Sequence, residues 1–580
     1  MYEKVFTYNF IGNFFFSLFF LIISILFSVK VSKNNNIKKL FNFEEYQPIV
    51  IFFLIFCLYV FLFNLTILFN YKLISYIFFL IFSLKFLFVV YIVNNNKTFF
   101  KNSLNINKKI IIIVFISLYL ISILPLSDAD SISIYQYLPT NIFINGLTDI
   151  DLHKNIEFTL LSNAEILLLI SPILKSDNFG SQLNLFVLFF FIILNFKKHQ
   201  NFSLILLSSP LIIYFISTQK LQLFFGILFL LTFIIIQNNF LKKKCELFIL
   251  IFLLVFYSSA KVSYILFAVP LFVYFLYKNL KKIKYIFLYS GISFLVVYLP
   301  LLILKQYYFG NIISPFADNI FGKGLESYEA FVYSIRSSEG WIADPTNYTL
   351  YIRPFISFNL STLSSSLGLV FLLMLVDYNL QKKTKFLPLI FISLVLVTGQ
   401  ILPRYYFEAF LLLAYYFQPK KIITKILIYS QVAIIFLISL VYIYFAYIKY
   451  EVYKDKNNYM NNFSYSFYNS KQHKQKKFEG NILDLGLDRH SIFFNENIYS
   501  SRYLNILNNY NNRNDQNLKE FIEKKTIKYL ISNTNYSAPD CLITQQVGKT
   551  YRKTAVRNFL LKPTKNEYKI LEIKDNKCSN

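Results

Sequence analysis

Long stretches of apolar residues recur along residues 1–450 and are separated by shorter polar segments. Most stretches are long enough to cross the hydrocarbon core of a bilayer, about 30 Å thick, as helices that bond all their own backbone groups. The first begins at Phe10, is too long for a signal peptide and lacks a small-residue cleavage site, so we expect a retained helix. The pattern predicts about fourteen transmembrane helices, near residues 10–29, 49–70, 73–94, 109–126, 180–196, 202–217, 221–240, 246–259, 263–277, 284–304, 355–376, 386–402, 405–418 and 424–447.

Lysines gather in small clusters between the apolar stretches, and two predicted spans separate each cluster from the next. The clusters are Lys30, Lys33, Lys38 and Lys39; Lys97, Lys101, Lys108 and Lys109; Lys197 and Lys198; Lys242 to Lys244; Lys278, Lys281, Lys282 and Lys284; Lys382, Lys383 and Lys385; and Lys420, Lys421 and Lys425. The positive-inside rule places such loops in the cytoplasm. Residues 127–179, residues 305–354 and the tail after residue 448 then lie outside. The sequence thus predicts a multi-pass protein of the plasma (inner) membrane with large periplasmic loops.

Composition agrees with this class of protein. Of the 580 residues, 56% are hydrophobic, and the mean hydropathy is +0.48. A net charge of +27 would suit a nucleic-acid partner. Within residues 1–450, however, the lysines come in small clusters between apolar spans, so their distribution indicates topology. We therefore expect a lipid bilayer and no nucleic acid.

The chain changes character after the last predicted span. Residues 451–477 are rich in Asn, Tyr and Lys and predict a linker. Residues 478–580 predict a small extracytoplasmic α/β domain, because strand-like stretches flank a helical one. The expected strands are 481–485, 527–532 and 568–573, and the expected helix is 518–525. Cys541 and Cys578 both fall in this domain, which predicts a disulfide in an oxidising compartment; chance co-location is the alternative.

Two carboxylates, Asp128 and Asp130, follow the apolar span that ends at Leu126, on the side away from the lysine clusters. A carboxylate near hydrocarbon costs about 2.5–3.5 kcal/mol on insertion scales, so such residues usually face a cavity, pair with a cation or have a function. The alternative is a helix that ends in an Asp-rich turn.

The polar segment that follows predicts a surface helix over residues 132–144, which Asn145-Gly146 ends. The apolar stretch 166–174 is too short to span a bilayer and predicts a re-entrant or interfacial helix. Ser162 or Asn163 would cap that helix, and Glu165 fits a capping box with Ser162. Glu165 therefore has two interpretations, a cap and a substrate-binding residue.

Arg404 lies at the outer end between two apolar spans, an uncommon position for arginine under the positive-inside rule. Its fork of donors matches phosphate oxygens, whereas snorkelling to lipid headgroups is the alternative. Arg336 in the second insertion is a weaker candidate of the same kind. Trp341, the single tryptophan, can stack on a sugar or anchor its loop at the membrane interface.

The acidic pair lies in an early predicted external loop, and the segment Asn163-Ala164-Glu165-Ile166-Leu167 follows it. The segment Pro403-Arg404-Tyr405 lies at the mouth of a later predicted helix, and a predicted soluble domain ends the chain. This plan resembles the GT-C superfamily of membrane glycosyltransferases. The resemblance implies a polyprenyl-phosphate-linked sugar as donor and a glycan, lipid or protein as acceptor. It also implies that an acidic loop residue acts as the catalytic base or helps to hold a divalent metal, Mg²⁺ or Mn²⁺. Here about three predicted helices precede the span that leads into the acidic loop, whereas many members place that loop after the first helix.

The residues suit this chemistry without the resemblance. Sugar transfer from a lipid phosphate needs a base for the acceptor hydroxyl and cationic or hydrogen-bonding groups for the departing phosphate. Asp128 or Asp130 can supply the first, and Arg404 with Tyr405 the second. No zinc-type cysteine spacing, phosphate-binding glycine loop or Gly-x-Ser-x-Gly motif occurs in the sequence.

Two other classes of function remain open. A polymerase or ligase of lipid-linked glycans would use the second insertion. A lipid or glycan transporter would need ionisable residues inside its spans, which hold few beyond Lys85 and Glu408.

Overall fold

The computed structural model describes most of residues 10–314 and, beyond them, shorter segments, and every structural statement below concerns these residues. The described residues are 10–94, 106–126, 128, 130–147, 160–195, 200–238, 241–314, 321, 352, 354–356, 366–376, 386–398, 402–419, 421–455, 459–460, 480–485, 498–500, 521–533, 542–553 and 565–576.

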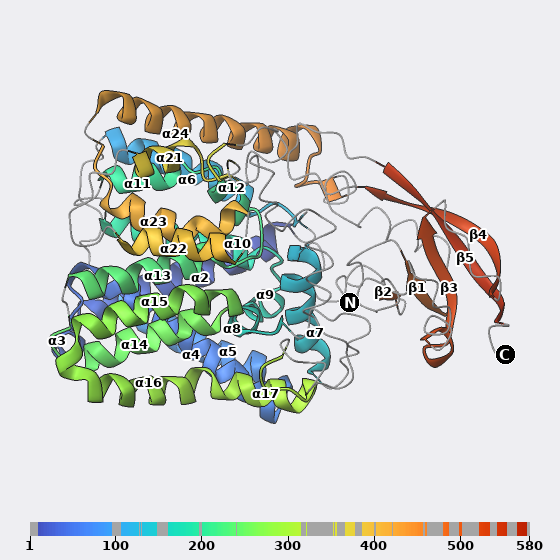
Figure 1. Cartoon of the computed structure of the whole chain (residues 1–580), viewed down its shortest axis with the longest axis horizontal. Coiled ribbons are helices and arrows are strands. Elements are labelled where there is room, and N and C mark those ends of the chain that lie inside the picture. Colours follow the sequence, from blue (N-terminus) through green and yellow to red (C-terminus); the bar gives the residue numbers. More distant parts are fainter. Residues whose placement is uncertain are drawn as a thin grey trace.

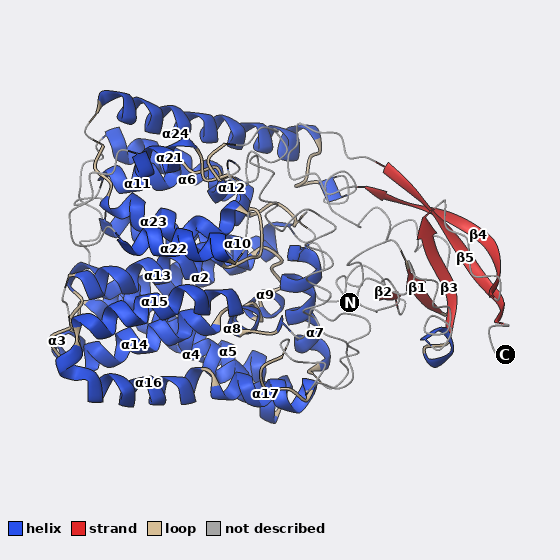
Figure 2. Cartoon of the chain, viewed as in Figure 1, coloured by secondary structure: helices blue, strands red, loops and turns tan. Residues whose placement is uncertain are grey.

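Most described residues are helical, and the helices pack side by side into one body (Figures 1 and 2). The α-helices are α2 (Phe10–Ser32), α3 (Asn35–Leu40), α4 (Gln47–Phe69), α5 (Ile74–Asn94), α6 (Ile106–Ser122), α7 (Tyr137–Asn145), α8 (Asn163–Leu167), α9 (Ile170–Ile173), α10 (Phe179–Asn195), α11 (Gln200–Leu207), α12 (Leu211–Ile216), α13 (Gln222–Gln237), α14 (Lys244–Ser259), α15 (Val262–Lys278), α16 (Ile283–Val297), α17 (Leu299–Phe309), α21 (Leu369–Val376), α22 (Phe386–Val397), α23 (Phe407–Tyr416) and α24 (Ile422–Ile443). Two turns matter for the site, the π-helical η3 (Ser131–Gln136) and the 3-10 helix η7 (Pro403–Tyr406).

Four of the described helical segments are long and apolar enough to cross a membrane. They are Phe14–Ser32, Glu44–Phe69, Tyr71–Tyr91 and Ile422–Lys449, and the pair α15 and α16, bent by 93°, would be a fifth if it formed one span. Several other helices at predicted spans are apolar but shorter. The helical class is therefore confirmed, whereas the number of fourteen spans stays a prediction.

Two of the predicted spans are interrupted. The stretch 202–217 forms α11 and α12, which meet at Pro210, and the stretch 284–304 forms α16 and α17, which meet just before Pro300. Proline lacks an amide donor and disfavours helical geometry at the preceding residue. The apolar pattern alone does not reveal these breaks.

Hydrogen bonds bring three of the lysine clusters to one end of the helical body. The Lys243 ammonium donates to the carbonyls of Lys38 and Lys39 at 3.2 and 2.6 Å, and the Lys282 ammonium donates to the Leu241 carbonyl at 2.7 Å. Helix α3, which carries Lys38 and Lys39, lies at the far end of the body from α7 and α9 (Figure 1). The clusters that the positive-inside rule assigns to one side thus share an end.

The outer helices expose large apolar side chains over much of their length. Among them, Phe15 of α2 is 55% exposed, Leu84 of α5 61%, Phe287 of α16 59% and Leu437 of α24 59%. Soluble monomers rarely expose so many large apolar residues along the length of their helices. These faces suit contact with lipid.

The segment after the acidic pair is helical, as predicted, but it is not on the surface. Residues Tyr137 to Ile142 of α7 are buried, because α7 packs against α8, α9 and η3. The stretch 166–174 is divided between α8 and α9 and is also buried. The prediction of a surface helix over residues 132–144 was therefore wrong, since an amphipathic pattern does not show which neighbours cover a helix. For residues 166–174, the re-entrant or interfacial helix stays a prediction.

A small mixed sheet follows the helical body, with strand order β2-β1-β3-β5-β4 (Figure 1). Strand β1 (Asn481–Asp484) pairs in parallel with β2 (Ile498–Ser500) and β3 (Ile527–Asn533), and β5 (Lys565–Asn576) is antiparallel to β3 and β4 (Leu542–Lys553). The three predicted strands are confirmed. Strands β2 and β4 were not predicted, because β2 has three residues and β4 is largely polar.

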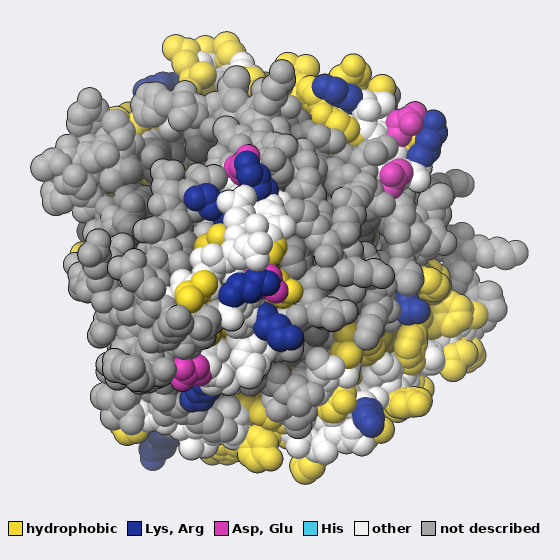
Figure 3. Space-filling view, turned by 90° about the vertical axis from the view of Figure 1, so that its right-hand side faces the viewer, with side chains coloured by type: hydrophobic (Ala, Val, Ile, Leu, Met, Phe, Trp, Pro, Cys, Tyr) yellow, Lys and Arg dark blue, Asp and Glu magenta, His cyan; other side chains and the backbone are white. Residues whose placement is uncertain are grey.

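On the face in Figure 3 the described charged side chains form small groups of both signs.

Candidate functional site

The predicted aspartates lie between α6 and η3, where the chain turns at the end of the helical body. Asp128 Oδ2 accepts hydrogen bonds from the amide and the hydroxyl of Ser131, both at 3.1 Å. The Asp128 side chain is 5% exposed, whereas that of Asp130 is 22% exposed. Asp128 thus does stabilise a turn, and Asp130 is the more accessible carboxylate.

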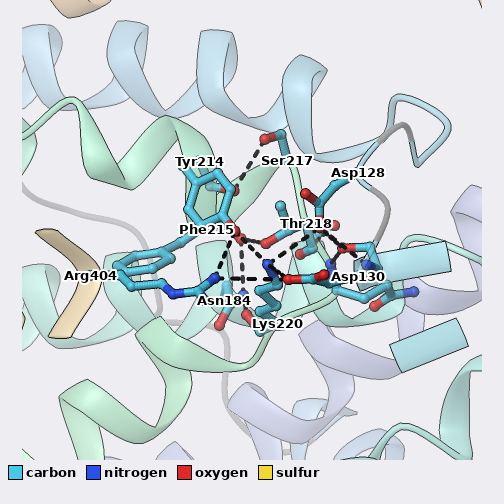
Figure 4. A network of polar contacts seen from close by, with 12 residues as sticks. Asp128, Asp130, Asn184, Tyr214, Phe215, Ser217, Thr218, Lys220 and Arg404 are labelled. Carbon is cyan, nitrogen blue, oxygen red and sulfur yellow. Dashed lines mark hydrogen bonds and ion pairs between the residues drawn. The ribbon is translucent and has the colours of Figure 1, made fainter. Parts of the chain in front are cut away.

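Lys220 joins the two aspartates. Its ammonium lies 2.7 Å from Asp130 Oδ2 and 3.4 Å from Asp128 Oδ2, and its side chain is 4% exposed (Figure 4). Burial lowers the pKa of Lys220, but the charges of Asp128 and Asp130 outweigh burial, so the pKa is raised overall and the amine stays charged. Lys220 was not predicted. The signal was present, because residues 218–220 link two predicted spans on the side expected to lie away from the lysine clusters, and a lysine there departs from the positive-inside rule as Arg404 does.

The N-terminal turn of α10 holds the link that carries Lys220. The Asn184 amide donates to the Lys220 carbonyl at 2.6 Å, and the Gly180 amide donates to Gln219 Oε1 at 2.6 Å. A Cβ atom at Gly180 would lie 2.1 Å from that oxygen. Residue 180 must therefore be glycine for α10 to approach the link this closely.

Arg404 comes to the same place from the other half of the chain. Its Nη1 donates to the Tyr214 hydroxyl at 3.2 Å and lies 3.9 Å from Asp130 Oδ2 (Figure 4). The Lys220 ammonium donates to the same hydroxyl. The buried Arg404 Nε has no hydrogen-bond partner among the described residues. The described residues thus accept hydrogen bonds from only some of the donors of the Arg404 guanidinium.

Close packing of α13 against α23 sets the position of η7 and hence of Arg404. A Cβ atom at Gly226 of α13 would lie 2.8 Å from the ring of Phe407, the first residue of α23. Glycine at this position lets the two helices approach, and η7 directly precedes α23.

Tyr405, the next predicted residue, lies beside two cations. The Arg404 Cζ atom is 5.4 Å and the Lys261 Nζ atom 5.8 Å from the centre of its ring. Both distances suit cation–π attraction. Lys261 is a second residue that was not predicted, although residues 258–261 likewise link two predicted spans on the side expected to lie away from the lysine clusters.

Glu165 forms the capping box that the sequence predicts. Its Oε2 accepts from the Ser162 amide at 2.8 Å and from the Ser162 hydroxyl, which also approaches the Ala260 carbonyl. Burial raises the pKa of Glu165 to about 7, and the hydrogen bond from Ser162 and the charge of Lys261 limit the rise. The cap is therefore confirmed, and a role in binding stays a prediction.

Tyr135 of η3 lies close enough to Glu165 and to the aspartate cluster for their charges to act on its phenol. Burial raises the pKa of the Tyr135 phenol, the charges of Glu165 and Asp130 raise it further, and that of Arg404 lowers it. The phenol therefore lies within electrostatic reach of both acids and of the guanidinium.

The remaining predicted residues, Arg336 and Trp341, lie outside the described residues, as do Cys541 and Cys578.

The arrangement of the two aspartates does not suit Mg²⁺ or Mn²⁺, because the Lys220 ammonium lies where a bridging cation would bind. Within the described part of the chain, no group of three or more His, Cys, Asp or Glu side chains could hold a metal.

Comparisons with known proteins add no relative. No family model, curated protein or solved structure matches the chain.

Proposed function

We propose that the protein is a membrane glycosyltransferase that moves a sugar from a polyprenyl-phosphate donor to an acceptor on the extracytoplasmic side. One observation carries the proposal: residues far apart in sequence, Asp130, Lys220 and Arg404, form one partly buried cluster of charges. The cluster lies near α7 and α9, because Gln219, next to Lys220, donates to Gln136, which precedes α7, and to Ser171 of α9. These helices lie at the end of the helical body away from α3 (Figure 1).

The cluster has the parts that sugar transfer requires. Asp130 takes the proton of the acceptor hydroxyl as its oxygen forms a bond to the sugar C1. The bond between C1 and the phosphate oxygen breaks, and its electron pair goes to the phosphate. The Arg404 fork binds the phosphate oxygens. Asp128 fixes the turn and, through Lys220, the position of Asp130.

The membrane arrangement belongs to the same proposal. About fourteen spans cross a plasma (inner) membrane, with the lysine clusters inside and the charge cluster and C-terminal sheet outside. The shared end of three lysine clusters and the exposed apolar faces of α2, α5, α16 and α24 support it. The lipid tail of a polyprenyl donor would reach the cluster from the bilayer.

The test uses purified protein in lipid nanodiscs with a panel of polyprenyl-phosphate hexoses and pentoses and a lipid extract as acceptor. We expect the wild type to consume at least one donor. Asp130→Asn should lower turnover on the order of a hundredfold, since proton transfer is lost, and Asp128→Asn should lower it less. Lys284→Gln, an exposed lysine at the other end, is the matched control.

Two results would contradict the proposal. One is a wild type, normally folded, that consumes no donor of the panel. The other is an Asp128→Asn, Asp130→Asn double variant that keeps near-normal turnover at normal expression. Either result would favour a polymerase or ligase of lipid-linked glycans, or a transporter.

A further inference from the structure

Lys261 is a cation that the described protein leaves largely uncompensated. It precedes α15 as its N-terminal cap residue and is partly buried. Its ammonium makes no hydrogen bond or ion pair with the described residues, and its one close partner is the ring of Tyr405, at 5.8 Å. Burial lowers the pKa of Lys261, and the charges of Arg404 and Lys220 lower it further, whereas Tyr405 and Glu165 raise it. A bound anion would stabilise this amine.

The local balance of charge favours an anion beside Lys261. Lys220 and Arg404 pair with the two aspartates, and Lys261 lies beside them as a third cation, which leaves one positive charge. Glu165 contributes less than a full negative charge at neutral pH, because its pKa is about 7. Lys220 contacts both aspartates. Lys261 and Arg404, which lie 5.8 and 5.4 Å from the centre of the Tyr405 ring, are therefore the cations left for a ligand.

Sugar transfer changes the charge of the lipid phosphate by one unit and the charge of the protein by one unit. The donor phosphate is a diester with one negative charge, and the departing monoester gains a second, since its second pKa is about 6. Meanwhile the proton that moves to an aspartate removes one negative charge from the protein. The surplus on the protein rises from one to two as the charge on the phosphate falls from minus one to minus two. A cation that meets the new charge binds the transition state more strongly than the donor.

We infer that Lys261 binds the second negative charge that forms on the lipid phosphate, so that Lys261 and Arg404 together hold the departing phosphate monoester beside Tyr405. The inference rests on the proposed function and goes beyond it by assigning the leaving-group charge to a particular residue. It also predicts selectivity: the site prefers a phosphate monoester to a phosphate diester.

The test compares two soluble probes, farnesyl phosphate and its methyl diester, as ligands of the nanodisc-embedded protein by calorimetry at pH 7.5. Lys261→Met should weaken binding of the monoester roughly ten- to hundredfold, as expected for loss of a charged hydrogen bond, and change that of the diester about threefold or less. Lys261→Arg should restore much of the difference. At pH 5, where the monoester carries one charge, the wild type should discriminate less between the two probes, and the difference between wild type and Lys261→Met should shrink. In the transfer assay, kcat should fall more than KM rises.

Lys284→Met, an exposed lysine at the other end of the body, is the matched control and should bind both probes like the wild type. If Lys261→Met misfolds, Lys261→Gln keeps a polar side chain and is subject to the same comparison. Equal loss for both probes, or no loss for either, would overturn the inference. A wild type that binds neither probe and transfers no sugar would instead overturn the proposed function, so the two failures are distinct.

Discussion

At the scale of single residues, the site depends on a lysine that neutralises two carboxylates. Lys220 is almost fully buried and lies within 3.4 Å of both Asp128 and Asp130. Two aspartates this close would repel each other and resist burial without it. Lys220 therefore decides whether the acidic pair can remain charged in the folded protein.

Replacement of Lys220 by Met should destabilise the protein. Removing one partner of a buried ion pair costs about 3–5 kcal/mol, and we expect the lower end because Asp130 is partly exposed. Thermal unfolding of the detergent-solubilised variant, followed by fluorescence, measures the change. Adding Asp130→Asn should restore part of the loss, because one stranded charge disappears. A single variant as stable as the wild type would show that the aspartates do not need Lys220.

At the scale of elements, the short helix α8 owes its start to a charged group that burial disfavours. Glu165 is 5% exposed and bonds to the amide of Ser162, so it serves as cap and as buried acid at once. The groups that face it are Lys261 and the phenols of Tyr135 and Tyr264. The cap needs an acceptor oxygen, not a charge.

The pH dependence of stability tests this description. The pKa of Glu165 is raised from 4.5 to about 7 in the folded state, so its contribution to stability is fully present below pH 4.5 and is lost as pH rises through about 7. Glu165→Gln keeps the acceptor for Ser162 and removes the titration. Its melting temperature should fall less than that of the wild type between pH 5 and 8. Parallel curves for the two proteins would contradict the raised pKa.

At the scale of the whole molecule, the two ends of the helical body carry different sets of charged residues. The lysines near α3, α14 and α16 gather at one end, and the charge cluster lies near α7 and α9 at the other. Such a polarity is what the positive-inside rule produces in a multi-pass protein.

Cysteine labelling in cells checks that polarity. In a background without the four native cysteines, Lys175→Cys and Gln545→Cys should react with an impermeant maleimide in intact cells, because both exposed positions are expected outside. Lys39→Cys and Lys284→Cys, also exposed, should react only after permeabilisation. The reverse pattern would invert the topology, and labelling of all four in intact cells would argue against membrane insertion.

The sequence by itself determined the helical class, because apolar stretches and lysine clusters are properties of consecutive residues. It also marked Asp128, Asp130 and Arg404 as candidates, since charged residues at the ends of apolar spans stand out locally. It predicted the cap formed by Ser162 and Glu165, whose partners are three residues apart. Strands β1, β3 and β5 were recognisable for the same local reason.

Only the tertiary structure decided which of these residues meet. The separations between Asp130, Lys220 and Arg404 are 90 residues or more, so no local pattern reports their contact. The burial of α7 and α8 depends on which helices cover them, and the approach of α10 to the link at Lys220 depends on the absent side chain of Gly180. Lys261 became a candidate once the described residues around it were seen to form no ion pair with its ammonium. A sequence records where charges occur, and packing decides which of them neutralise each other.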